Sequence, residues 1–253
     1  MCGRYAFTSA PEAIRLLLRY LERPNFPPRF NVAPTQPIAI CRLVNGERHF
    51  ALVRWGLLPS WVKDPKKFTL LANARGETVM EKPAYRAAMK RRRCLIPAHG
   101  FYEWKAGGAR KQPYYIRFKS GEPFAFAGLW ETWTGPNGEE LETAVIVTTT
   151  ANQTLKPIHD RMPVILAPDA FDLWLDGANV DPVTASALIA PAPDNLLEAY
   201  PVSTDVNRVA NDNPKLLESV VVGAEPEPAP KPKAAKRAPV KKAKKDSGQG
   251  ALF

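Results

Sequence analysis

The chain has 253 residues, 45% of them hydrophobic, which is enough for one sizeable core and short for two independent domains. No apolar run approaches the roughly 18 residues of a membrane span. Three cysteines, an odd number, form no disulfide framework, and no apolar segment follows Met1. We therefore expect a protein of the reducing cytoplasm.

The formal net charge is +10, and its distribution is uneven. Residues 224–253 hold eight Lys/Arg against three Asp/Glu, so this segment carries half of the charge. It alternates Ala, Pro and Lys and has too little apolar surface to offset the entropy of ordering. We predict a disordered tail over 224–253 and one folded, monomeric domain over 1–223.

Short apolar runs separated by many prolines predict strands and turns. Arg4–Thr8 is the first predicted strand, and the spacing of apolar residues in Pro11–Leu21 predicts an amphipathic helix. The further predicted strands are Ile38–Leu43, Phe50–Trp55, Arg93–Ile96, Phe101–Trp104, Tyr114–Phe118, Phe124–Leu129 and Thr143–Thr149. The further predicted helices are Ala84–Lys90, Asp169–Leu175 and Pro182–Ile189.

This pattern indicates an α+β fold with a predominantly antiparallel sheet curled into a barrel-like core. No βαβ repeat or glycine-rich phosphate loop is present, so we expect no nucleotide cofactor. The cysteines and histidines also lack the spacing of a metal site. We expect no cofactor of any kind.

Cys2 is the first candidate for chemistry. Aminopeptidases commonly remove Met1 before a small residue, which would leave an α-amine and a thiol on one residue. Roughly a quarter of such an amine is unprotonated near neutral pH, because its pKa is about 7.7–8.0. The amine can attack an aldehyde, and the thiol can then close a five-membered thiazolidine ring. For an isolated Met-Cys start, a structural cysteine is the more common alternative.

Glu103 lies within Phe101-Tyr102-Glu103-Trp104. Strand alternation places Glu103 and Phe101 on one face and Tyr102 and Trp104 on the other. Aromatic surroundings would raise the pKa of the carboxyl, which suits proton exchange with an imine. An exposed strand glutamate is an equally good interpretation of this motif alone.

Two further polar clusters follow. His159, in Ile158-His159-Asp160-Arg161, titrates near neutrality and can act as acid or base, or it can simply pair with Asp160. In Asn73-Ala74-Arg75, the amide can orient an amine and the guanidinium can bind a phosphate.

Six motifs, in order from residue 1 to about 215, resemble those of the SOS response-associated peptidase family. They are Met1-Cys2-Gly3-Arg4-Tyr5, Asn31-Val32-Ala33-Pro34-Thr35, Arg54-Trp55-Gly56-Leu57-Leu58-Pro59-Ser60-Trp61, Asn73-Ala74-Arg75, Phe101-Tyr102-Glu103-Trp104 and His159-Asp160-Arg161-Met162-Pro163. The resemblance implies a single barrel-like domain that binds single-stranded DNA and shields abasic sites. It also implies that Cys2 forms a thiazolidine crosslink once Met1 is removed.

The resemblance further assigns roles to residues. Asn73 would orient the Cys2 amine, Glu103 would manage the imine protons, and His159 would assist opening of the sugar ring and reversal of the crosslink. A lyase-type activity would accompany this chemistry. It implies that Arg4, Arg75 and Arg161 bind phosphates, that Trp61 and Pro34 contact bases near the lesion, and that Thr148 also contacts the DNA. A DNA-binding role places the protein close to the nucleoid, or in the nucleus if the source is eukaryotic.

The chain departs from the family pattern at two positions. His99 stands where an acidic or amide residue is more common, and we expect it to add an ionisable group close to Glu103. Val62 follows Trp61 where some members carry a second aromatic, so we expect weaker base stacking here.

Two other classes of function compete with this one. An N-terminal cysteine with Asn, Glu and His is also typical of self-processing amide hydrolases, for which the one secure cleavage is the loss of Met1. The third class is a non-covalent binder of single-stranded nucleic acid in which Cys2 is incidental.

The end of the tail carries a separate short motif. Gln249, Leu252 and Phe253 resemble the peptides that bind the bacterial replication sliding clamp, and an incidental apolar end is an equal alternative.

Overall fold

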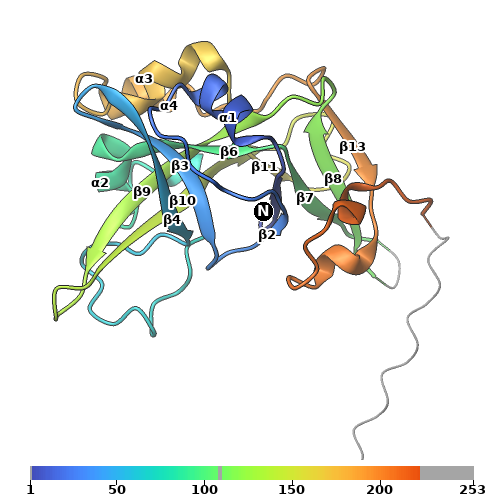
Figure 1. The fold of residues 1–253 in the computed structure, drawn as a ribbon, viewed down its shortest axis with the longest axis horizontal. Coiled ribbons are helices and arrows are strands. Elements are labelled where there is room, and N and C mark those ends of the chain that lie inside the picture. Colours follow the sequence, from blue (N-terminus) through green and yellow to red (C-terminus); the bar gives the residue numbers. More distant parts are fainter. Residues whose placement is uncertain (1, 108–109, 223–253) are drawn as a thin grey trace, which may run out of the picture.

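A computed structural model describes residues 2–107 and 110–222. Five of its strands form a closed ring in the order β10-β4-β3-β6-β9 and back to β10, which makes a small barrel without free edges (Figure 1). Their bounds are β3 (Pro37–Val44), β4 (Glu47–Trp55), β6 (Arg93–Ala98), β9 (Phe124–Thr134) and β10 (Glu140–Thr150). Three short strands extend the ring: β5 (Asn73–Arg75) and β11 (Arg161–Pro163) pair with β10, and β12 (Ile165–Leu166) pairs with β9.

A second sheet, antiparallel throughout, lies against the barrel in the order β13-β8-β7-β1-β2. Its strands are β1 (Tyr5–Phe7), β2 (Arg29–Val32), β7 (Gly100–Lys105), β8 (Gln112–Phe118) and β13 (Leu197–Pro201). The main core lies between the sheets: the Tyr5 ring meets Trp55 of the barrel at 5.4 Å and Phe126 at 6.0 Å, both edge to face.

The helices are short and lie on the outside of the two sheets (Figure 1). They are α1 (Pro11–Leu18), α2 (Arg86–Arg91), α3 (Phe171–Leu175) and α4 (Pro182–Ser186), with 3-10 turns η1 (Gly76–Thr78), η2 (Pro168–Ala170), η3 (Thr204–Asn207) and η4 (Pro214–Leu217). Among the described residues, none of these helices has the length and apolar character required to cross a membrane.

The predicted fold class is confirmed, and each strand predicted from the sequence is present with shifted ends. The largest shift is in β9, which continues to Thr134 instead of ending at Leu129, because its second half pairs with β10. The segment Asp169–Leu175 divides into η2 and α3, and the helix predicted to reach Ile189 ends at Ser186.

The first helix was also predicted too long, since α1 ends at Leu18 and not at Leu21. Arg19 adopts a left-handed backbone (φ 57°), and its N–H closes the last turn on the Arg15 carbonyl. The Arg48 side chain then donates to the Leu18 carbonyl (2.8 Å), and the Leu21 N–H bonds to the Arg48 carbonyl (3.2 Å). These contacts with the neighbouring strand β4 take the place of a further helical turn.

Asn31, fully buried in β2, fastens the C-terminal segment to the second sheet. Its amide nitrogen donates to the carbonyls of Val206 (3.2 Å), Arg208 (3.1 Å) and Asn211 (2.8 Å). Its side-chain oxygen accepts from the Arg4 guanidinium at 2.8 Å. One asparagine therefore satisfies several polar groups that would otherwise be buried without partners.

Residues 223–253 lie outside the described residues, together with Gln249, Leu252 and Phe253 of the clamp-like motif. The disordered tail, the domain boundary at residue 223 and clamp binding stay predictions.

We predict that Asn31→Ala lowers the free energy of unfolding by about 2–4 kcal/mol, because it leaves buried carbonyls and the Arg4 guanidinium unsatisfied. Urea unfolding followed by tryptophan fluorescence measures the change. Asn25→Ala is the matched control at an exposed position, with an expected change under about 0.5 kcal/mol. A similar, small loss in both variants would contradict the role given to Asn31.

Candidate active site

The register of the second sheet carries the start of the chain past Glu103. Tyr5 pairs with Phe101, and the Tyr102 N–H donates to the Arg4 carbonyl at 3.0 Å. Continued in the antiparallel direction, this pairing sets the residues before β1 alongside Glu103. Cys2 is therefore held next to a carboxyl group from a different part of the chain.

Asn73 fixes Cys2 from the barrel side. Its side-chain nitrogen donates to the Cys2 carbonyl at 2.9 Å. Asn73 itself is positioned by pairing of β5 with β10, opposite Ile146, and by the Tyr85 hydroxyl, which donates to the Asn73 carbonyl at 3.2 Å. The Asn73 Oδ1 atom is buried and accepts no hydrogen bond within the described part of the chain. It is an acceptor directed into the same small region as the Cys2 backbone.

Glu103 and His159 form the second half of the cluster. The Glu103 Oε2 and His159 Nε2 atoms are 4.0 Å apart, with the carboxylate side chain 3% and the imidazole 25% exposed. Burial raises the pKa of Glu103 to about 7 and lowers the pKa of His159 below its usual value. Near neutral pH the carboxyl is therefore partly protonated and lies beside an imidazole that is mainly neutral, which suits proton exchange.

The other ring nitrogen of His159 has two different contacts. The Arg161 backbone N–H donates to Nδ1 at 2.9 Å, which requires an unprotonated nitrogen. The Asp160 carboxylate also lies 2.9 Å from Nδ1 and accepts from it when the ring is protonated. The imidazole thus has a suitable partner in either protonation state.

The Cys2 thiol is fully buried, and its hydrogen bond to the Arg4 carbonyl is long, 3.8 Å. Burial, followed by the nearby negative charge of Glu103, raises the pKa of the thiol well above its usual range. The sulfur is therefore a thiol at neutral pH and needs a base before it can act as a nucleophile. Glu103 is close enough to influence it electrostatically.

The three arginines predicted to bind phosphate differ in their surroundings. Arg75 is exposed and has no ion pair among the described residues. Arg161 makes a two-pronged ion pair with Glu77 and donates to the Thr148 carbonyl at 2.8 Å. Arg4 donates to Asn31 and to the Val206 carbonyl. Only Arg75 is fully available to an incoming phosphate; the other two hold parts of the fold together.

Thr148 does not have the position predicted for a DNA contact. Its side chain is fully buried within β10, because β5 and β11 pair on either side of it. Its hydroxyl donates to the Ala74 carbonyl (3.4 Å) and accepts from Arg161 (3.2 Å). Thr148 therefore orients Arg161 and is shielded from DNA.

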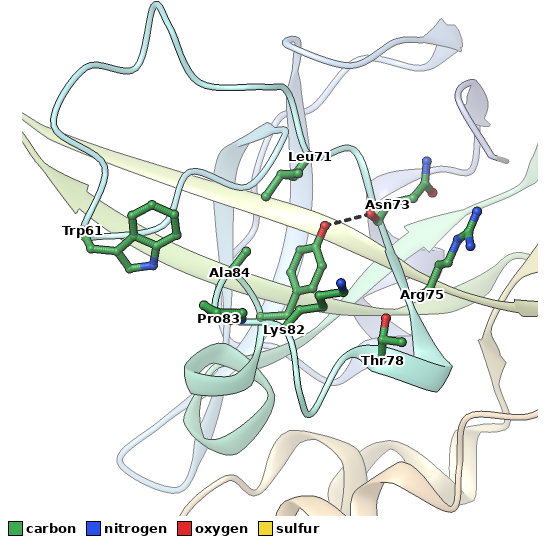
Figure 2. A pocket seen from close by; sticks show the side chains of 9 residues that line it. Trp61, Leu71, Asn73, Arg75, Thr78, Lys82, Pro83 and Ala84 are labelled. Carbon is green, nitrogen blue, oxygen red and sulfur yellow. Dashed lines mark hydrogen bonds between the residues drawn. The ribbon is translucent and has the colours of Figure 1, made fainter.

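An open hollow of about 610 Å³ borders the cluster, and its lining includes Asn73, Trp61 and Arg75. Figure 2 shows Trp61 on one side of this hollow and Arg75 on the other, with Lys82 between them. The Trp61 ring is 58% exposed and touches Phe68 edge to face, so a broad aromatic surface faces solvent. Pro34, the other predicted base contact, is half-buried in the turn after β2.

The two departures from the family pattern have different outcomes. His99 lies in the bend between β6 and β7, four residues before Glu103, and the charge that acts on its pKa after burial is that of Arg117 and not that of Glu103. Its Nδ1 contacts the Thr8 hydroxyl at 2.8 Å. Val62 is buried against Leu58 and Trp133, so this position adds no stacking surface beside Trp61.

Three residues at the site were given no role by sequence reasoning. Tyr85 supports Asn73, Glu77 holds Arg161, and Asn31 holds Arg4. Asn31 does lie inside a quoted motif, and Glu77 lies two residues after another, Asn73-Ala74-Arg75. Tyr85 had none. The described residues contain no group of three His, Cys, Asp or Glu side chains that would hold a metal ion.

Comparisons with known proteins found a matching family and several relatives. The family described as SOS response associated peptidase (SRAP) matches residues 1–209. The abasic site processing protein YoqW of Bacillus subtilis (strain 168) is 41% identical over 223 residues, covering 87% of this chain and 100% of that protein. The abasic site processing protein YedK of Escherichia coli (strain K12) is 33% identical over 230 residues, with 87% and 100% covered.

The same family relation extends to eukaryotes and to solved structures. The abasic site processing protein HMCES of Xenopus tropicalis is 33% identical, covering 90% of this chain and 81% of that protein. A crystal structure of a protein from Bacteroides thetaiotaomicron has a TM-score of 0.76 at 27% identity, covering 87% of this chain and 100% of that one. The chain therefore belongs to the SOS response associated peptidase (SRAP) family.

Proposed function

We propose that the protein binds single-stranded DNA at abasic sites and couples the sugar aldehyde covalently to Cys2 after Met1 is removed. The observation that carries the proposal is the meeting of four groups from distant segments: Asn73 on Cys2 at 2.9 Å, and His159 facing Glu103 at 4.0 Å. The relatives named as abasic site processing proteins indicate the substrate. In this proposal, the only peptide bond that is hydrolysed is the one between Met1 and Cys2.

The chemistry begins with the amine. The unprotonated α-amine of Cys2 adds to the aldehyde carbon, and the resulting carbinolamine loses one water to give an imine. The thiol sulfur then bonds to the imine carbon while its proton passes to the imine nitrogen, which closes the thiazolidine ring. The net change is the loss of a single water, and no oxidant or cofactor takes part.

The surrounding side chains divide the proton transfers among themselves. Asn73 Oδ1 accepts a hydrogen bond from the Cys2 amine, and this keeps the lone pair of the amine nitrogen directed at the aldehyde. Glu103, with a pKa of about 7, protonates the carbinolamine hydroxyl, which leaves as water, and the resulting carboxylate later takes the thiol proton and returns it to the imine nitrogen. His159 transfers a proton to the ring oxygen of the closed sugar. The ring then opens more readily, which increases the amount of free aldehyde. Reversal of the crosslink and strand cleavage by a lyase step would use the same groups.

The arrangement of the hollow suits a single strand. Arg75 binds a phosphate next to the lesion, and the exposed Trp61 ring stacks on a neighbouring base. Neither contact reads base identity, in keeping with a lesion that has lost its base.

The role of the thiol is tested by Cys2→Ser, which keeps the amine and removes the ring-closing sulfur. We expect the wild-type protein to give a band on denaturing gels with abasic single-stranded DNA, without any reductant. The variant should give a comparable band only when borohydride is present to reduce its labile imine. A tetrahydrofuran analogue of the abasic site, which has no aldehyde, is the control. An equally durable crosslink with Cys2→Ser would exclude the thiazolidine.

The role of the buried carboxyl is tested by Glu103→Gln, which keeps the size of the side chain and abolishes proton exchange. The adduct should form about 100-fold more slowly. Glu103 is protonated below its pKa of about 7, so the wild-type rate should fall as this acid is lost at higher pH, while amine deprotonation has the opposite effect. Adduct rates measured between about pH 5.5 and 9 should be bell-shaped for wild type and lack the falling limb in the variant. Profiles of the same shape would remove Glu103 as the acid.

The stacking role is tested by Trp61→Ala. Loss of one base–aromatic stack costs about 1–3 kcal/mol, so the affinity for an undamaged single strand should fall roughly 5- to 150-fold. Fluorescence anisotropy of a labelled oligonucleotide measures this. Trp61→Phe should recover most of the affinity, and an unchanged Kd in Trp61→Ala would show that bases do not stack there.

A peptidase acting on other proteins is the competing function. Turnover of unrelated peptides that disappears in Cys2→Ala, with no DNA adduct, would favour it.

A further inference from the structure

A row of three cations leads away from the hollow across the outside of the barrel. Lys82, Arg86 and Lys90 are four residues apart, and all three are exposed. Lys82 lies in the turn that leads into α2, and its carbonyl accepts from the Arg86 N–H at 3.0 Å. Arg86 and Lys90 both lie in α2, where residues four apart share one face of the helix, about 6 Å apart along its axis. We call these three residues the cationic row.

The cationic row faces solvent because the opposite face of α2 is packed. Ala88 and Met89 are buried, and the helix contacts β6 and β9 on that side. Within residues 2–107 and 110–222, none of the three cations forms an ion pair. The acidic residue nearest to them in the sequence is Glu81, next to Lys82. Exposed cations without partners keep their full charge available to an anionic ligand.

The cationic row begins at the candidate active site. Lys82 lines the same hollow as Asn73, Trp61 and Arg75 (Figure 2). Arg86 and Lys90, the next two cations of the row, line a second hollow of about 360 Å³ together with Pro182 of α4. An anionic chain bound at Arg75 would therefore meet Lys82 first and the two α2 cations next.

We propose that the cationic row binds neighbouring phosphates of the DNA strand on one side of the lesion, as an extension of the site beyond the residues that touch the abasic sugar. This inference rests on the proposed function for the direction of the strand, and not on the covalent chemistry. Evenly spaced point charges suit a flexible single strand, whose phosphates are held by charge and not by base sequence. The cationic row would increase the affinity for the strand and fix the direction in which the strand binds, whereas the catalytic groups contact only one sugar.

The test uses the double variant Arg86→Gln/Lys90→Gln in the full-length protein. Its matched control is Arg23→Gln/Lys119→Gln, which removes two exposed cations elsewhere and changes the net charge equally. Affinity is measured by anisotropy on undamaged oligonucleotides at several salt concentrations. The α2 variant should lose about 10- to 30-fold in affinity at 0.1 M salt, and the slope of log K against log salt should become less steep by about 1.4.

Polarity gives the sharper measurement. Abasic oligonucleotides are extended by six nucleotides on the 5′ side only or on the 3′ side only, and the concentration dependence of adduct formation is compared. The α2 variant should lose the benefit of one extension and keep that of the other. With an abasic trinucleotide, too short to reach α2, its adduct rate should stay within about twofold of wild type.

Three results would overturn the cationic row: an unchanged salt slope, an equal loss in the control variant, or an equal loss for both extensions. The outcome is separable from that of the proposed function. If wild-type protein forms no adduct with abasic DNA, while the α2 variant still shows the weaker salt dependence, the proposed covalent chemistry is wrong and the proposed role of the cationic row is still supported.

Discussion

The hydrogen bond from the Asn73 side chain to the Cys2 carbonyl, 2.9 Å long, is the contact on which the candidate site depends. The first residues of a chain are commonly frayed, and a nucleophile there would have little fixed geometry. Here strand pairing between β5 and β10 fixes Asn73, and Asn73 in turn fixes Cys2 against the barrel. Positioning of this kind removes much of the entropic cost of bringing an amine to an aldehyde.

Burial adjusts the chemistry of the groups that meet there. The same dry environment raises the pKa values of Glu103 and of the Cys2 thiol and lowers that of His159. In the proposed mechanism a proton passes between Glu103 and His159 near neutral pH, while the sulfur stays protonated until a base is available. Arg75, the cation proposed to bind a phosphate, lies outside this interior, where its charge is exposed. The groups proposed for acid–base chemistry and the group proposed for strand binding are thus separated in space.

Much of this arrangement follows from the sequence, and the exceptions have physical reasons. Short apolar runs were sufficient to predict strands such as Tyr114–Phe118, and Phe101 and Tyr102 do pack into separate hydrophobic clusters, as strand alternation predicted. Three-residue strands such as β5 and β11 are set by tertiary pairing and leave no such pattern. Thr148 was misjudged for the same reason, since its burial depends on those two neighbours of β10. The sequence was sufficient to predict which residues could form the site, but not which neighbouring residues hold them in position.

The most direct test counts the thiols that remain after coupling. Protein crosslinked to an abasic oligonucleotide is denatured, treated with iodoacetamide and weighed intact. The chain has three cysteines, and ring closure consumes the sulfur of Cys2, so the account predicts an adduct without Met1 that gains only two carbamidomethyl groups, on Cys41 and Cys94. An adduct that retains Met1, or that gains three such groups, would contradict it.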